Sequence, residues 1–335
     1  MAGRAATLQD VAELAGVSRA TASLGLRDRG RMSAATRARI RAAAAELDYV
    51  ANATARSLRT SRSGTVGLYV PDHTLSFRYY MDVAFGAVER AQAEDVLVTL
   101  MPAAYSPRSG IPRHLDGFIV IDPTDDDPVV AGLLDGDAPV VSGELPPPAM
   151  TAPFGVVHSD HVVGIRTILD HLWEQGSRRP AAILADRAMA WGRQTQDGYA
   201  AWCRERGVEP RLVETSTRMT FAELGTQVAA LVEDLDGVDA VIGGVEGTVL
   251  VVAEAIAAAG LRVGEDLLLA AYVDSDSLAV VQPSITALDL QPREFGRQCM
   301  RLLAGALDGS IEPGTSVEVP TRLVVRESTR AVAVG

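Results

Sequence analysis

Hydrophobic and polar residues follow a helical spacing near the start of the chain, where residues 7–26 run TLQDVAELAGVSRATASLGL. Thr7 followed by Asp10 predicts a helix N-terminus, because a hydroxyl cap and an acidic first turn stabilise that end. A glycine then supplies a tight turn, and Ser18 is placed to cap a second helix over residues 19–26. The pattern predicts a helix-turn-helix, whose second helix enters the DNA major groove, although an ordinary helical hairpin has the same local pattern.

A third helix is predicted over residues 37–47, with Ser33 as its N-cap. Residues 51–59 also permit a helix and precede a linker rich in Ser, Gly and Thr. An isolated helix of this length is marginal in water. We therefore expect DNA or a second copy of the chain to order it.

From residue 65 onward, short apolar runs alternate with helical patterns, which predicts parallel sheets of the doubly wound α/β class. Strands are too numerous for one small sheet, so two similar lobes are expected, with a ligand cleft between them at the carboxyl ends of the strands. The predicted strands are 66–70, 96–101, 118–121, 139–141, 154–157, 181–184, 240–242 and 267–271, and the predicted helices are 80–94, 164–175, 197–207, 221–235 and 250–260.

Charge is distributed unevenly along the 335 residues, whose net charge is −12. Residues 1–60 contain ten Arg and five acidic residues, so a basic head precedes an acidic body. This asymmetry is typical of a DNA-binding protein with a separate sensing domain. The sequence has no 18-residue apolar run, and its N-terminus does not have the pattern of a signal peptide. Cys203 and Cys299 are expected to be buried free thiols. These features predict a cytoplasmic protein without a membrane span, metal or cofactor.

Several motifs resemble the LacI/GalR family of bacterial repressors over about residues 7–330. The head contributes TLQDVAELAGVSRATAS, MSAATR and YVANATARSL, with Ala51 where the family usually has proline. The core contributes VGLYVPD, an Asp160-to-Arg179 pattern, the DGY at 197–199 and LVVREST at 323–329. The resemblance implies a helix-turn-helix head (1–50), a hinge helix and linker (51–62), and a two-lobed core (63–335) like a periplasmic binding protein, with crossovers near 156–165 and 285–320.

The resemblance also implies a transcriptional regulator that binds a pseudo-palindromic operator as a homodimer, with DNA affinity modulated by a small molecule. The second helix then presents Arg19 to DNA, either to a guanine edge or to a phosphate. Leu24 stands where the family usually has a base-reading arginine, so a different operator preference is expected. Leu58 matches the leucine that wedges into the minor groove, unless it is an exposed linker residue. The predicted DNA contacts are Thr7, Ser18, Arg19, Ala20, Thr21, Ser23, Leu24, Arg27, Asn52, Ala55 and Leu58.

The predicted effector cleft departs from the family at three usually polar positions, which are Thr195, Val245 and Val273 here. We expect an apolar, aromatic cleft with Arg193 and Asp160 as polar handles, and weak or no binding of simple hexoses. Either a less polar effector or no effector is consistent with this composition. The predicted effector-binding residues are Tyr79, Tyr80, Asp160, Trp191, Arg193, Thr195, Val245 and Val273.

Enzyme motifs are weak in this sequence. The glycines at 243–247 lack dinucleotide spacing, and the His158–His161 segment is better explained as a strand end that leads into a helix than as a metal or catalytic cluster. Asp125–Asp127 is interpreted as a solvated loop. Two alternatives to an effector-responsive regulator are a periplasmic-type ligand-binding module and a regulator whose core only dimerises. No C-terminal coiled coil is expected, which favours a dimer over a tetramer.

Overall fold

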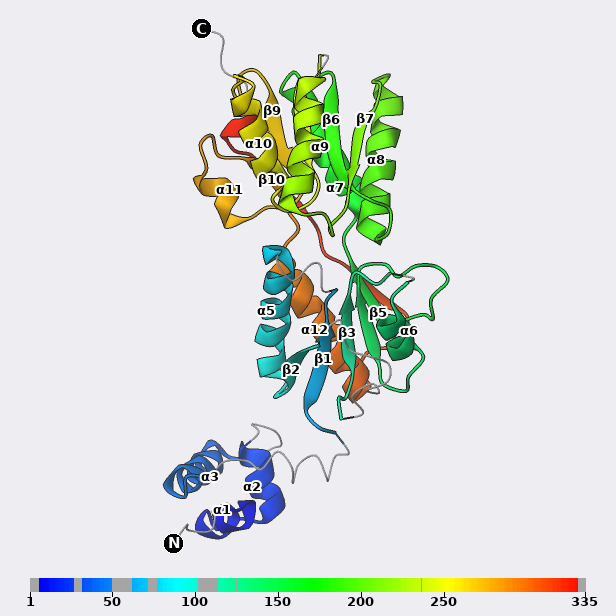
Figure 1. Ribbon diagram of the computed structural model, residues 1–335. Helices are drawn as coiled ribbons and strands as arrows, with labels where there is room; N and C mark the ends of the chain where they lie inside the picture. The colour runs from blue at the N-terminus through cyan, green and yellow to red at the C-terminus, as the bar shows by residue number, and fades with distance from the viewer. Residues whose placement is uncertain are drawn as a thin grey trace. The chain divides into compact units, whose positions relative to one another are not determined.

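The computed structural model describes residues 6–26, 32–49, 62–71, 77–101, 114–124, 126–235 and 237–330 (Figure 1). The chain divides into two units, residues 1–64 and residues 65–335, and we describe each by itself. The predicted fold class, an all-α head followed by a two-lobed α/β core, is confirmed. The predicted hinge helix and its Leu58 lie outside the described residues.

The head contains the three predicted helices, α1 (Leu8–Leu14), α2 (Arg19–Leu26) and α3 (Ala34–Glu46). Thr7 and Asp10 form a reciprocal capping box at the start of α1: the Asp10 amide donates to Thr7 Oγ1, and the Thr7 amide donates to Asp10 Oδ2 at 2.7 Å. Ser18 Oγ accepts from the Thr21 amide at 3.1 Å, and Ser33 Oγ accepts from the Thr36 amide at the start of α3. The predicted caps therefore fix where the helices begin.

The core of the head is small and built mostly from alanine. Its fully buried members are Val11, Ala12, Ala15, Ala22, Ile40 and Ala43. Ile40 is the largest of them, and a Cβ on Gly25 would lie 2.6 Å from Ile40 Cδ1. Gly25 therefore lets α2 approach α3 closely enough for Ile40 to fill the space between them.

The larger unit, residues 65–335, is the two-lobed core, and each of its lobes contains one six-stranded sheet. The N-lobe sheet has the order β11-β5-β4-β3-β1-β2 and is entirely parallel. The C-lobe sheet has the order β12-β10-β9-β8-β6-β7 and is parallel except for β12. The strands are β1 (Thr65–Tyr69), β2 (Leu97–Met101), β3 (Phe118–Ile121), β4 (Val140–Gly143), β5 (Gly155–His158), β6 (Pro180–Ala185), β7 (Arg211–Thr215), β8 (Ala240–Gly243), β9 (Leu268–Ala271), β10 (Thr286–Asp289), β11 (Thr315–Glu318) and β12 (Arg322–Val324).

Helices cover both faces of each sheet. Those of the N-lobe are α5 (Arg78–Ala93), α6 (Pro128–Leu134) and α12 (Pro292–Asp308); those of the C-lobe are α7 (His161–Glu174), α8 (Ala190–Arg206), α9 (Phe221–Glu233), α10 (Thr248–Ala258) and α11 (Asp276–Val280), with the short helix η3 (Glu327–Thr329). The helix α12 packs along α5 although about two hundred residues separate them. A Cβ on Gly296 would lie 1.9 Å from the Val83 carbonyl oxygen, so glycine is required where these helices touch.

Some predicted elements need correction. The helix α8 begins at Ala190, not at residue 197, and Asp127 is not part of a solvated loop. Its carboxylate caps α6 by accepting from the amides of Val129 and Val130, and Pro128 occupies the first helical position, where its missing amide costs nothing. The two cysteines are buried free thiols, as predicted.

The chain passes between the two sheets three times, after β5, after β10 and after β11. Each lobe is therefore assembled from separate parts of the sequence. Among the described residues, no helix is both long and apolar enough to cross a membrane.

Candidate effector pocket and DNA-reading helix

A cavity of about 40 Å³ lies between the lobes, at the carboxyl ends of the parallel strands, where ligands bind in such folds. Both lobes contribute to its wall. The lining residues are Phe77, Tyr79, Tyr80, Asp122 and Glu144 from the N-lobe, His161, Trp191, Thr217, Val245, Glu246, Tyr272 and Val273 from the C-lobe, and Leu290 from a crossover.

Two carboxyl groups lie on the floor of this cavity. Asp122 directly follows β3, and Glu144 directly follows the neighbouring strand β4. Each side chain is about 3 % exposed, and each backbone adopts a left-handed conformation, with φ of 49° and 82°. Non-glycine residues in that region carry strain, which concentrates at functional sites.

Three of the four carboxyl oxygens of Asp122 and Glu144 lack a hydrogen-bond partner among the described residues. Asp122 Oδ2 accepts from Tyr80 Oη at 2.6 Å. Within the described part of the chain, Asp122 Oδ1 and both carboxylate oxygens of Glu144 are buried without a hydrogen-bond partner. Buried acceptors in native proteins are normally satisfied, so these three oxygens need an explanation.

His161 joins the two lobes beside Glu144. Its Nε2 lies 3.1 Å from Glu144 Oε1, a short ion-pair distance without the orientation of a hydrogen bond, and its Nδ1 lies 2.8 Å from Tyr272 Oη. Burial lowers the pKa of His161, but the negative charges of Glu144 and Asp122 outweigh burial and raise it above its ordinary value. Burial, followed by the charge of Glu144, raises the pKa of Asp122 to about 7.

Glu246 makes a second contact between the lobes. This C-lobe residue accepts from the backbone amides of Arg78 and Tyr79, each at 3.0 Å, in the first turn of the N-lobe helix α5. The residue before that helix, Phe77, provides no side-chain cap. A carboxylate from one lobe therefore caps a helix of the other, where the helix dipole favours negative charge.

Five of the eight predicted effector-binding residues line the cavity, namely Tyr79, Tyr80, Trp191, Val245 and Val273. The other three, which include both expected polar handles, are not among the lining residues. Asp160 caps α7 by accepting from the Val163 amide, and the Arg193 guanidinium donates to the backbone carbonyls of Arg187 and Ala188. Thr195 is fully buried in α8 and donates to the Gly192 carbonyl.

The expected composition of the cleft is correct for its aromatic residues but incomplete for its charge. Four charged or titratable lining residues were not predicted from the sequence, namely Asp122, Glu144, His161 and Glu246. One available signal was an acidic residue immediately after a predicted strand, because the strand order brings such positions to one edge. The interpretation of His158–His161 holds: β5 ends at His158, and α7 begins at His161. Among the described residues, no group of three or more His, Cys, Asp or Glu is arranged to hold a metal ion.

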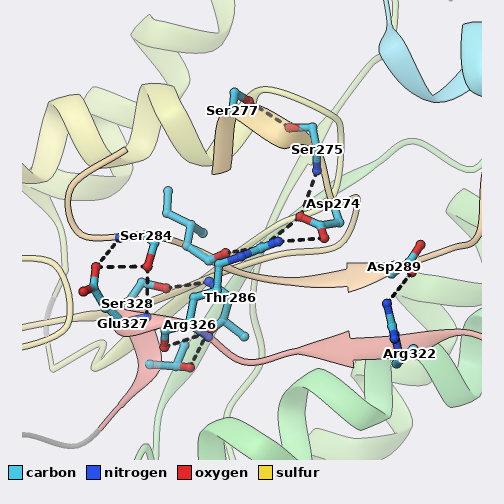
Figure 2. Close-up of polar contacts among 12 residues, drawn as sticks. Asp274, Ser275, Ser277, Ser284, Thr286, Asp289, Arg322, Arg326, Glu327 and Ser328 are labelled. Atoms are coloured by element: carbon cyan, nitrogen blue, oxygen red, sulfur yellow. Dashed lines mark hydrogen bonds and ion pairs between the residues drawn. The ribbon is translucent and has the colours of Figure 1, made fainter. Parts of the chain in front are cut away.

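The C-lobe wall of the cavity is fixed from behind by the end of the chain. Figure 2 shows Asp274, the residue after Val273, in a bidentate contact with Arg326 at 2.8 and 2.9 Å. Next to it, Glu327 accepts from the amide and hydroxyl of Ser284, and Ser328 Oγ accepts from the Thr286 amide. These contacts hold the segment that carries Tyr272 and Val273 against β10.

In the head, α2 presents an exposed face with Ser18, Arg19, Ala20 and Leu24. Thr7 and Thr21 are half-buried, and their hydroxyls take part in the caps of α1 and α2. Ser23, in contrast, is only 8 % exposed, so the head itself covers most of a side chain that was predicted to contact DNA. Its position directly after Ala22 places it on the buried side of the short helix. Arg27, Asn52, Ala55 and Leu58 lie outside the described residues.

Comparison with known proteins agrees with both units. Residues 7–52 match the model of the bacterial regulatory proteins of the lacI family, and residues 169–329 match a periplasmic binding protein-like domain. The HTH-type transcriptional regulator CelR of Thermobifida fusca is 31% identical over 337 residues, covering 97% of this chain and 98% of CelR. The chain belongs to the LacI family. The predicted family membership is thus confirmed, and this LacI-family chain is a DNA-binding transcriptional regulator.

Other LacI-family relatives extend this comparison. The transcriptional repressor CytR of Escherichia coli (strain K12) is 28% identical, covering 98% of this chain and 97% of CytR. A structure of a CelR–cellobiose complex has a TM-score of 0.73 at 26% identity, covering 96% of this chain and 99% of the other. A lac repressor dimer bound to operator and the anti-inducer ONPF, at 22% identity, shares the fold with a TM-score of 0.76 over 98% of this chain and 100% of the other.

Proposed function

We propose that this LacI-family regulator is a cytoplasmic repressor that binds a pseudo-palindromic operator as a homodimer. A small molecule in the cavity between the lobes modulates its DNA affinity, and residues 51–62 act as the hinge between the head and the core. Relatives named as repressors, and the cellobiose complex of CelR, support this proposal. The alternative of a core that only dimerises predicts that no ligand changes DNA binding.

The assignment of the cavity as the effector site rests on where the two lobes contact each other. His161 meets Glu144, and Glu246 meets the first turn of α5, and all three of these side chains line the cavity itself. A ligand that binds there must change the distances or charges of those contacts. Binding is therefore coupled to the angle between the lobes, and such coupling is commonly about 1–3 kcal/mol.

An apolar surface on the N-lobe supports the homodimer. Phe85 and Val88 on α5 and Leu97 and Leu100 on the edge strand β2 are exposed, and Leu97 is 71% exposed. Because α5 packs beside β2, these side chains belong to one region of the lobe. Exposed apolar patches of this kind mark interaction surfaces, and an edge strand needs protection from unwanted pairing. Sedimentation of the Leu97→Arg variant should show weaker dimerisation, whereas an unchanged dimer would place the interface elsewhere.

The DNA-reading proposal depends on the exposed face of α2. Arg19 is free of the core of the head and can donate two hydrogen bonds to guanine O6 and N7, which discriminates by about 1–3 kcal/mol. Leu24 offers only apolar contact at its base step. An in vitro selection of bound DNA should show relaxed preference at one position for Arg19→Ala and a new preference for Leu24→Arg. If Arg19→Ala weakens binding uniformly with the same preferred sequence, Arg19 contacts phosphate.

A further inference from the structure

We propose that the effector of this cavity carries a protonated amino group, held between the carboxyl groups of Asp122 and Glu144. The inference rests on the proposed role of the cavity as the effector site, and it adds the chemical class of the ligand. It starts from the three buried carboxyl oxygens that have no donor within the described part of the chain.

The number and position of these acceptors fit an ammonium group. Asp122 and Glu144 end neighbouring parallel strands, so their carboxyl groups enter the cavity side by side. Tyr80 supplies one donor to Asp122, and His161 Nε2 lies 3.1 Å from Glu144 Oε1, so Asp122 Oδ1 and Glu144 Oε2 are the acceptors most in need of a donor. A primary ammonium group has three N–H donors and no acceptor, which matches a site made of acceptors.

The balance of acidic and basic groups in the lining also favours a cation. His161 is the only basic side chain among the described residues of the lining, and it faces two carboxyl groups. Hydroxyl groups of a neutral ligand would satisfy the acceptors, but three carboxyl groups of the lining, those of Asp122, Glu144 and Glu246, would still face one basic side chain. A cationic ligand supplies both the donors and the missing charge.

The nearby arginines do not supply that charge, because each is engaged elsewhere. Arg78 pairs with Asp82 at 2.8 Å on the surface of α5. Arg193 donates to two backbone carbonyls of its own segment. Arg326 is held in the bidentate pair with Asp274, behind the wall of the cavity (Figure 2).

The aromatic side chains of the lining favour a cation as well. Phe77, Tyr79, Tyr80, Trp191 and Tyr272 line the cavity, and the rings of Tyr79 and Tyr80 meet edge to face with centroids 5.2 Å apart. Aromatic faces attract cations, and aromatic cages are a common solution for binding alkylammonium groups. The cavity thus combines carboxyl groups with aromatic side chains, and both kinds of group attract a cation.

The experiment uses matched pairs of probes that differ by an ammonium group in place of a hydroxyl group. The pairs are D-glucosamine with D-glucose and 2-phenylethylammonium with 2-phenylethanol, and D-cellobiose is a further neutral probe. Each is titrated calorimetrically into the full chain, into Glu144→Gln and into Asp122→Asn. Glu254→Gln, on the exposed side of α10, is the matched control. Circular dichroism verifies that each variant folds.

The proposal expects the amine of at least one pair to bind roughly 10- to 100-fold more tightly than its neutral partner, the effect of a charge-assisted hydrogen bond. Glu144→Gln and Asp122→Asn should each remove most of that difference, whereas Glu254→Gln should keep it. The proposal is overturned if neutral partners bind as tightly as amines, if no amine binds, or if both cavity variants retain the preference.

A parallel titration of selected operator DNA separates this inference from the proposed function. If a neutral probe such as cellobiose changes DNA affinity and no amine binds, the effector site stands and the cationic ligand is refuted. If an amine binds through Glu144 without changing DNA affinity, the chemistry of the cavity stands and its coupling to DNA is refuted.

Discussion

Replacing Glu246 by alanine should loosen the closed arrangement of the two lobes. In the native protein, its carboxylate accepts from the Arg78 and Tyr79 amides, each at 3.0 Å, across the boundary between the lobes. Hydrogen bonds to a charged group contribute about 1.5–3 kcal/mol each when buried, and about 1 kcal/mol each is a fair value for this partly exposed site. The loss of both therefore shifts the equilibrium toward the open arrangement by about 2 kcal/mol, or roughly 30-fold.

Amide hydrogen exchange of the first turn of α5 measures this shift directly, because exchange reports opening free energies of local structure. In Glu246→Ala, the amides of Arg78 and Tyr79 should exchange roughly 30-fold faster, by the shift derived above. Glu246→Gln keeps one acceptor oxygen without the charge, so these amides should exchange at a rate between those of the native protein and of Glu246→Ala. Glu254→Ala, which removes an exposed carboxylate from the same lobe, should have no effect. Unchanged exchange at both amides in Glu246→Ala would refute the idea that this carboxylate holds the lobes together.

Three further predictions concern stability. Ile40→Ala should lower the free energy of unfolding of the head by about 2–5 kcal/mol, enough to unfold this small unit. Calorimetry should then show the unfolding transition of residues 65–335 without that of the head, and DNA binding should disappear. A head that melts at its native temperature would contradict this. Gly296→Ala should destabilise the N-lobe by about 1–3 kcal/mol in urea denaturation, because the new Cβ meets the Val83 carbonyl oxygen. The control Gly225→Ala, also in a helix, should be neutral or stabilising, because its Cβ would lie 4.0 Å from the nearest atom, Val251 Cγ1. Equal effects of the two variants would argue against tight contact between α5 and α12. Burial raises the pKa of Asp122 to about 7, against 3.8 in the unfolded chain. Its contribution to the free energy of unfolding therefore falls as the pH rises from about 4 to about 7. Asp122→Asn should remove this part of the pH dependence, and plots of unfolding free energy against pH that run parallel for the two proteins would refute the raised pKa.

The head and the class of the core could be predicted from local signals. Thr7, Ser18 and Ser33 cap helices through neighbours three residues away, so their geometry depends only on nearby sequence. The alternation of strands and helices is likewise a local pattern, and it gave the two lobes correctly. Membership of the LacI family followed from motifs of the same kind.

The chemistry of the cavity could not be predicted in the same way. Asp122 and Glu144 meet because β3 and β4 are neighbours in the sheet, and Glu246 reaches α5 from more than 160 residues away in sequence. Such pairings depend on strand order and on how the lobes close. One of the family's usual ligand positions, Thr195, is fully buried in α8 and does not line the cavity, although Val245 and Val273 do.

The three passages of the chain between the sheets have a consequence for synthesis on the ribosome. The N-lobe needs α12 to cover α5 and needs β11 to pair with β5, yet both are made after the entire C-lobe sheet except β12. The emerging N-lobe therefore exposes an apolar helix face and a bare strand edge while about 150 more residues are translated. We expect the C-lobe to reach its native state at nearly the same time as the N-lobe, and chaperones that shield nascent chains to associate mainly with residues 65–158.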